Sequence, residues 1–163
     1  IPAREIINTW SEKDLQKLLF TLGEERFARQ IARGIVRVRI KKPFERTLDL
    51  VDAIKKNVPS YYRHAHIHCA TRTFQALRMR VNDELEHVAE GVRGAVSLIR
   101  KGGRIAVITF HSGEDRPVKQ LFLELERKET IKRITKRVVR PLREEYLQNP
   151  RARSAKLRVV ERI

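Results

Sequence analysis

The sequence has few of the residues that cross-link a chain or build a glycine-rich nucleotide loop. It has one cysteine, one methionine, one tryptophan and seven glycines among 163 residues. The single cysteine, Cys69, excludes a disulfide within the chain, which is typical of proteins in a reducing cytoplasm. No glycine-rich nucleotide loop is present, and no apolar run is long enough to span a membrane. The composition therefore predicts a cytoplasmic protein that has no membrane-spanning helix.

Acidic residues are also scarce. Lysine and arginine together number 36 against 20 aspartates and glutamates, so the formal net charge is +16. An excess of this size is more than solubility requires, and it favours a polyanionic partner, most simply a nucleic acid. An anionic membrane surface is the rival partner, but no amphipathic face rich in tryptophan and phenylalanine supports it.

Apolar spacing predicts helices in the first part of the chain and strands in the second. Helices are expected at 11–22, 24–39, 47–58, 72–100 and around 118–125, with a loop at 60–69. Ser11 is expected to cap the first of these helices and Thr47 the third. Strands are expected at 104–110, 131–139 and 156–163, the first of them of the buried type. The fold class is therefore α/β, with the second half resembling half of a doubly wound sheet.

Three strands are few for a doubly wound sheet, so we expect further strands upstream of Ile1. The sequence begins with neither an initiator methionine nor a charged-then-apolar leader. A fragment of a longer chain, a processed protein and a cloned segment would each begin in this way.

Arginines recur along the second predicted helix at three- and four-residue steps. They are Arg26, Arg29, Arg33 and Arg37. This spacing gathers them into a stripe beside the apolar face of the helix. A solvated surface and a ridge that contacts RNA phosphates both fit the stripe, and the sequence leaves the two open.

The best predicted strand is followed at once by polar residues. In open α/β sheets ligands bind at the carboxyl ends of strands, so His111, Ser112, Glu114 and Asp115 are candidate substrate-binding residues. A Ser–His hydrolase is disfavoured because no G-x-S-x-G turn surrounds the serine. Ser112 is instead expected to cap the next helix, with Asp115 at the third position. His111 keeps the best claim to direct contact with a substrate.

Two further segments carry residues suited to RNA. Arg72 and Gln75 begin the long predicted helix, where the arginine suits a phosphate and the glutamine suits a base edge. Arg151 and Arg153 lie on a proline-constrained loop before the last strand and suit phosphates. An ordinary capped helix and a plain turn are the alternatives.

Three histidines alternate with other residues beside the cysteine. His64, His66 and His68, with Cys69, are chemically adequate ligands for zinc. The usual ligand spacing is missing, so a basic loop or partly buried histidines is the favoured interpretation, and no metal site is expected.

Four segments together resemble one known family. They are residues 23–33, 70–85, 102–116 and 149–158, in family order and over nearly the whole chain. The chain resembles the MraW (RsmH) family of S-adenosylmethionine-dependent methyltransferases, which modify N4 of a cytidine in bacterial small-subunit ribosomal RNA. Two positions depart from the family pattern, Cys69 where proline is usual and Gly113 where leucine is usual. The glycine loosens the segment around His111.

The resemblance implies an inserted helical domain that recognises substrate at 1–70 and the C-terminal part of a class I (Rossmann-like) methyltransferase domain at 71–163. Members carry their cofactor-binding motifs upstream, so the resemblance assigns S-adenosylmethionine to a missing N-terminal part and no cofactor-binding or catalytic residue to this chain. The implied partner is small-subunit ribosomal RNA or the 30S subunit, and a homodimer stays open. The isolated chain is predicted to be inactive. The alternative function is a non-enzymatic, basic RNA-binding or ribosome-associated protein.

Overall fold

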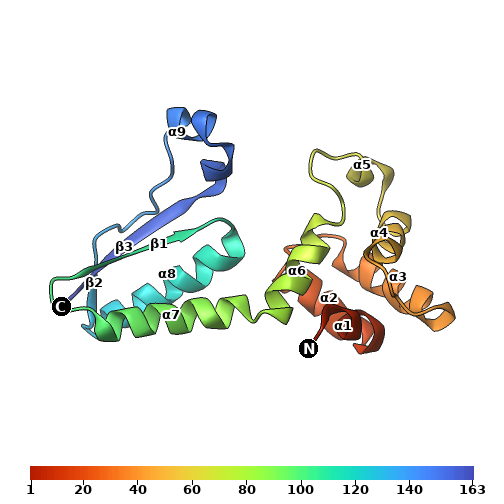
Figure 1. Cartoon of the computed structure of the whole chain (residues 1–163), viewed down its shortest axis with the longest axis horizontal. Helices are drawn as coiled ribbons and strands as arrows, with labels where there is room; N and C mark the ends of the chain where they lie inside the picture. Colours follow the sequence, from red (N-terminus) through yellow and green to blue (C-terminus); the bar gives the residue numbers. More distant parts are fainter. The chain divides into compact units, whose positions relative to one another are not determined.

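A computed structural model describes residues 1–163, which form two compact units, Ile1–Glu84 and Leu85–Ile163 (Figure 1). The sequence predicted a boundary after residue 70, whereas the helix that follows this residue belongs to the first unit. The separate roles predicted for the two parts of the chain stay predictions. No helix combines the length and the apolar character needed to cross a bilayer.

The first unit is entirely helical. Its helices are α1 (Ala3–Thr9), α2 (Glu12–Thr21), α3 (Ala28–Lys41), α4 (Thr47–Lys56), α5 (Ser60–Arg63) and α6 (Thr71–Val81). Their apolar faces meet in one core, with Ile6, Leu15 and Ile54 fully buried at its centre. The predicted cap of α2 is confirmed, because the Ser11 hydroxyl accepts a hydrogen bond from the Asp14 N–H at 3.1 Å.

Three local predictions in this unit were wrong. Helix α3 begins at Ala28, so Arg26 precedes the helix instead of lying on it. The stretch predicted as a loop at 60–69 contains the short helix α5. Thr47 is the first residue of α4 and not its cap, because Asp49 accepts the Arg46 N–H at 3.1 Å and closes the first turn.

The long helix predicted at 72–100 is two helices, α6 and α7 (Glu84–Leu98). They are separated by Asn82 and Asp83, and Asp83 adopts a left-handed backbone with φ of 46°. Asparagine and aspartate tolerate this conformation better than most residues. The apolar spacing continues across the break because both helices bury a face, so the spacing did not reveal it.

The second unit packs two helices on a small sheet. After α7 come β1 (Arg104–Thr109), α8 (Ser112–Arg127), β2 (Ile131–Arg133), α9 (Arg143–Gln148), the 3-10 helix η1 (Pro150–Ser154) and β3 (Lys156–Arg162). Helices α7 and α8 lie on the same side of the strands (Figure 1), and Val96, Phe122 and Val160 meet in the core between them.

The sheet has the order β1-β3-β2, and β3 runs antiparallel to both neighbours. The mixed α/β class is confirmed, whereas the three strands form no adjacent parallel pair and the Rossmann-like sheet stays a prediction. Strand β2 is shorter than the predicted 131–139, and beyond it only Val139 forms an isolated bridge to β3. Strand β1 is not buried on both faces, because Ile108 is 58% exposed.

Candidate functional site

The polar residues after β1 and the basic residues before β3 lie at the same end of the sheet. Thr109, the last residue of β1, pairs with Lys156, the first residue of β3. His111 follows the first of these strand ends, and Arg151 and Arg153 of η1 precede the second. Both arginines are exposed. The fold therefore gathers two sequence-predicted segments, far apart in the chain, at one end of the second unit.

His111, and not Ser112, is the cap of α8. The His111 Nδ1 atom accepts the Glu114 N–H at 3.2 Å, and the Glu114 Oε2 atom accepts the Phe110 N–H at 3.0 Å. Ser112 and Gly113 are thereby the first residues of the helix, so the expected loosening of a loop at Gly113 was wrong. This reciprocal arrangement fixes the imidazole and leaves its other nitrogen for further contacts.

Two buried polar atoms at the end of β1 have no hydrogen-bond partner, Thr109 Oγ1 and His111 Nε2. The Nε2 atom lies 3.0 Å from Glu114 Oε1 without forming a hydrogen bond. Because Nδ1 accepts a backbone N–H, the neutral ring carries its proton on Nε2, which is then a donor. Buried polar groups in folded proteins are nearly always paired. These two atoms therefore mark a candidate ligand site.

Asp115 joins α8 to β3. Its two carboxylate oxygens accept hydrogen bonds from Arg158 at 2.7 and 3.0 Å, and Lys156 Nζ lies 4.0 Å away. The hydrogen bond from Arg158 lowers the pKa of Asp115 below its ordinary value, against an opposing effect of burial. The carboxylate holds the helix that presents His111, while its contact with a substrate stays a prediction.

The predicted arginine stripe divides into two parts. Arg29, Arg33 and Arg37 are exposed along α3, and Arg37 donates a hydrogen bond to Asn57 Oδ1 at 3.1 Å. Arg26 lies before the helix, with its guanidinium carbon 4.9 Å from the centroid of the Tyr62 ring. Three arginines at four-residue steps therefore point outward from α3, and the fourth stacks on an aromatic ring.

Arg72 and Gln75 lie in the first turns of α6. Arg72 Nη1 donates a hydrogen bond to the Glu24 carbonyl oxygen at 2.7 Å, which ties α6 to the segment before α3. Gln75 is half-buried. The arginine is thus engaged within the unit, and contact of either side chain with RNA stays a prediction.

Comparison with known sequences decides the family. The whole chain, residues 1–163, matches the MraW methylase family. The chain belongs to this family. The resemblance found from the four sequence segments is thereby confirmed.

Curated relatives of the MraW methylase family carry the name ribosomal RNA small subunit methyltransferase H. The relative from Synechocystis sp. is 50% identical over 163 residues, which cover 100% of this chain and 52% of the relative. The relative from Persephonella marina is 46% identical over 161 residues, or 99% of this chain and 55% of the relative. The relative from Sulfurihydrogenibium sp. is 45% identical over 163 residues, or 100% and 56%. The chain therefore spans about half the length of these relatives.

A buried hydrogen-bonded cluster around Glu25, in the first unit of this MraW family chain, was not predicted from the sequence. Glu25 is completely buried, and its carboxylate accepts hydrogen bonds from the Tyr62 hydroxyl at 2.7 Å and the Phe27 N–H at 2.8 Å. Burial and the hydrogen bond to Glu25 raise the pKa of Tyr62 to about 12. The partners are more than thirty positions apart in the chain, so no local spacing could have revealed them.

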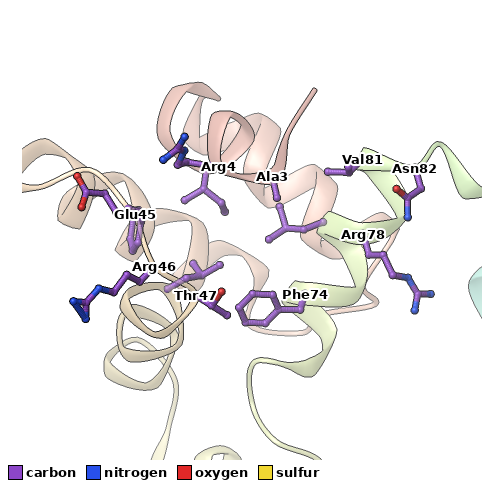
Figure 2. A pocket seen from close by; sticks show the side chains of 13 residues that line it. Ala3, Arg4, Glu45, Arg46, Thr47, Phe74, Arg78, Val81 and Asn82 are labelled. Atoms are coloured by element: carbon purple, nitrogen blue, oxygen red, sulfur yellow. The ribbon is translucent and has the colours of Figure 1, made fainter.

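A pocket of about 330 Å³ also lies in the first unit (Figure 2). Its lining residues come from α1, the segment before α4, α4 and α6: Ala3, Arg4, Ile7, Phe44, Glu45, Arg46, Thr47, Leu50, Phe74, Leu77, Arg78, Val81 and Asn82. In Figure 2 the Phe74 ring reaches into the cavity, whereas the Arg78 guanidinium points away from it.

The histidine segment forms local contacts. His64 Nδ1 is 2.9 Å from the Ser60 carbonyl oxygen, and His68 Nδ1 accepts the Ala70 N–H at 3.3 Å. Cys69 is buried as a free thiol in the core of the unit. His64, His66 and His68 are all exposed, which fits the basic-loop interpretation and not partly buried histidines.

Proposed function

We propose that this chain is part of a ribosomal RNA methyltransferase that transfers a methyl group from S-adenosylmethionine to N4 of a cytidine in small-subunit ribosomal RNA. The observation that carries the proposal is the match of all 163 residues to the MraW methylase family and to relatives named for this RNA. The net charge of +16 suits an RNA substrate.

His111 is the residue of this chain that we assign to the target base. A base inside a helical stack is out of reach, so it must be extruded and then held by hydrogen bonds to its Watson–Crick edge. The Nε2–H donor of His111, which lies 3.0 Å from Glu114 Oε1, complements an acceptor on that edge of cytosine, and the Thr109 hydroxyl two positions earlier has no hydrogen-bond partner. Orienting the exocyclic amine toward the methyl donor is the contribution expected of this end of the sheet.

Supporting residues surround this site. Glu114 holds the His111 cap, Asp115 anchors α8 to β3, and exposed Arg151 and Arg153 are suited to phosphates that flank the base. Ser112 begins the helix beside them. No residue of this chain is assigned to accept the amine proton.

S-adenosylmethionine is the methyl donor that the family implies, and the residues at the end of β1 do not fit it. The buried polar atoms that form no hydrogen bond are one hydroxyl and one ring nitrogen, while both nearby carboxylates are engaged in hydrogen bonds. We therefore infer that the donor is held by residues outside this chain. Titration calorimetry of residues 1–163 with S-adenosylmethionine should detect no micromolar binding, whereas such binding would contradict this inference.

The test of the base-binding role uses the complete gene product and small-subunit ribosomal RNA that lacks the modification. Methyl transfer from labelled donor should fall by about 5- to 100-fold in His111→Asn, as expected for one buried hydrogen bond. Asparagine preserves the helix cap, so folding is retained. His87→Asn, which alters an exposed histidine of α7, is the matched control. Equal activity of the two variants would contradict the role of His111.

The charge alone also suits a non-enzymatic RNA-binding protein. That function predicts RNA binding without methyl transfer in the complete gene product. The same assay therefore separates the two functions before any substitution is made.

A further inference from the structure

Three aromatic rings gather on the first unit next to the start of α3. The Phe27 and Tyr62 ring centroids are 4.8 Å apart, and those of Phe27 and Tyr61 are 6.3 Å apart in an edge-to-face arrangement. Phe27 precedes α3, whereas the two tyrosines belong to α5. The contact joins two segments that are distant in the sequence.

A single arginine covers all three rings. The guanidinium carbon of Arg26 lies 4.9, 5.5 and 6.0 Å from the centroids of Tyr62, Phe27 and Tyr61. These distances are within the range of cation–π attraction. Arg26 is nonetheless exposed and forms no ion pair with a carboxylate, so its charge is available to an anionic partner.

Buried Glu25 anchors the aromatic cluster formed by Phe27, Tyr61 and Tyr62. The buried Glu25 carboxylate receives the Tyr62 hydroxyl and the Phe27 N–H, and Arg72 binds the backbone of Glu24. A buried carboxylate is costly unless it is hydrogen-bonded, so its presence here fixes the segment that carries Arg26. The rings therefore need little rearrangement to accept a ligand.

The outer part of the cluster faces solvent. Tyr61 is 65% exposed, and its hydroxyl has no hydrogen-bond partner in the protein. Arg29, three residues after Arg26, and Arg63, two residues after Tyr61, are both exposed. An exposed ring beside an arginine, with further exposed arginines nearby in the sequence, suits the stacking of unpaired bases and the binding of the backbone that joins them.

We propose that Tyr61 and Arg26 form a stacking site for an unpaired base of RNA, with Arg29 and Arg63 contacting the flanking phosphates. This site rests on the proposed function for its ligand class and lies on a different unit from His111. Bases in a duplex are stacked on one another, so the site discriminates single-stranded from double-stranded RNA. An acidic peptide would use the same arginines without needing the ring of Tyr61.

The test measures binding of the complete gene product to a labelled single-stranded oligouridine of about twelve nucleotides. Tyr61→Ala should weaken binding by about 5- to 100-fold, the cost of one lost base–aromatic stack. Tyr61→Phe retains the ring and should bind like the unsubstituted protein. Phe20→Ala removes an equally exposed ring, 66% exposed on α2 with no arginine stacked on it, and should also bind normally. Because Tyr61 is exposed, its truncation leaves the fold intact, which a thermal melt verifies.

The opposite results would overturn the stacking site. Equal binding by Tyr61→Ala and Phe20→Ala would do so, as would an equal loss on single-stranded RNA and on the matched duplex. A loss by Tyr61→Phe equal to that of Tyr61→Ala would exclude stacking as its cause. Methyl transfer that depends on His111 while Tyr61→Ala binds RNA normally would reject this site and retain the proposed function. Absence of any RNA binding would reject both.

Discussion

Glu25 and Tyr62 form the most deeply buried side-chain hydrogen bond of the first unit, 2.7 Å long. Tyr62→Phe removes the donor and leaves the carboxylate with the Phe27 N–H alone. We expect the free energy of unfolding to fall by about 1–3 kcal/mol, the cost of an unsatisfied buried acceptor. Urea denaturation followed by circular dichroism measures it. Tyr61→Phe deletes a hydroxyl without a partner and should leave the stability unchanged.

The hydrogen bond between Tyr62 and Glu25 makes the stability of the first unit sensitive to high pH. The pKa of Tyr62 is raised from its ordinary value of 10.0 to about 12, first by burial and then by Glu25. Between these pH values the unfolded chain has lost the phenolic proton and the folded chain has kept it. The stabilisation is therefore complete below pH 10 and is lost as the pH rises toward 12. Absorbance titration should reveal a late phenolate step that Tyr62→Phe abolishes, and persistence of the step would assign it elsewhere.

The ion pair between Asp115 and Arg158 makes the stability of the second unit depend on pH in the opposite direction, with a loss at low pH. Arg158 is 8% exposed and binds both carboxylate oxygens, so Asp115→Ala leaves a buried charge without its partner. The expected loss of unfolding free energy is about 3 kcal/mol near neutral pH. The pKa of Asp115 is lowered from 3.8, so its contribution is present above that pH and is lost on acidification.

Thermal melts between neutral and acidic pH test this dependence. The unsubstituted chain should approach the stability of Asp115→Ala as the pH falls below 3.8. Glu124→Ala breaks an exposed pair with Lys128 on the same helix and should have no measurable effect. A constant difference between Asp115→Ala and the unsubstituted chain at all pH values would contradict the assignment.

At the scale of elements, Gly23, two residues after the end of α2, lies close to the backbone of α6. A Cβ atom built there would lie 2.6 Å from the Arg72 carbonyl oxygen and 2.8 Å from that of Leu19. Both atoms are backbone, so Gly23→Ala should cost about 1–3 kcal/mol of unfolding free energy. Gly91→Ala in α7 meets nothing within 4 Å and should instead stabilise by about 0.5–1 kcal/mol. Thermal melts of the two variants should therefore shift in opposite directions.

The elements also reveal what periodicity in the sequence can and cannot predict. Repeating apolar positions identified α2, α3, α4 and β1 because each buries a continuous face. The same signal continued through Asn82 and Asp83, because a residue with a left-handed backbone ends a helix without interrupting the spacing of apolar residues. Apolar periodicity could not predict the order of the strands in the sheet, because strand pairing depends on which strands meet and not on their composition.

Only part of the candidate site could be predicted from the sequence. The polar run after β1 contained His111, but His111 and Ser112 were both competent caps, and only the backbone conformation distinguishes them. The nearness of η1 to this site follows from the Thr109–Lys156 pairing, which the sequence does not state. The aromatic cluster of Phe27, Tyr61 and Tyr62 depends on a tertiary contact, so it produces no periodic pattern in the sequence.

For the molecule as a whole, the excess of positive charge predicts salt-sensitive RNA binding. Each phosphate contact that is lost should reduce the slope of log affinity against log salt by about 0.7 for single strands. Arg29→Gln and Arg33→Gln remove exposed charges of α3, whereas Arg104→Gln removes a charge paired with Glu161. We expect flatter slopes for the first two variants and an unchanged slope for the third. Equal slopes for all three would reject α3 as the phosphate-binding ridge.

The position of β3 has a consequence for the synthesis of the protein. This strand is the last of the three to be translated, yet it lies between the other two and supplies every ladder hydrogen bond of the sheet. While β1 and β2 emerge from the ribosome, neither has yet met β3, its partner within these residues. Helix α8, whose bonds are local, can form at once. The edge of β1 that faces β3 therefore stays open until Lys156–Arg162 has left the exit tunnel, and an open strand edge in a nascent chain is prone to aggregation.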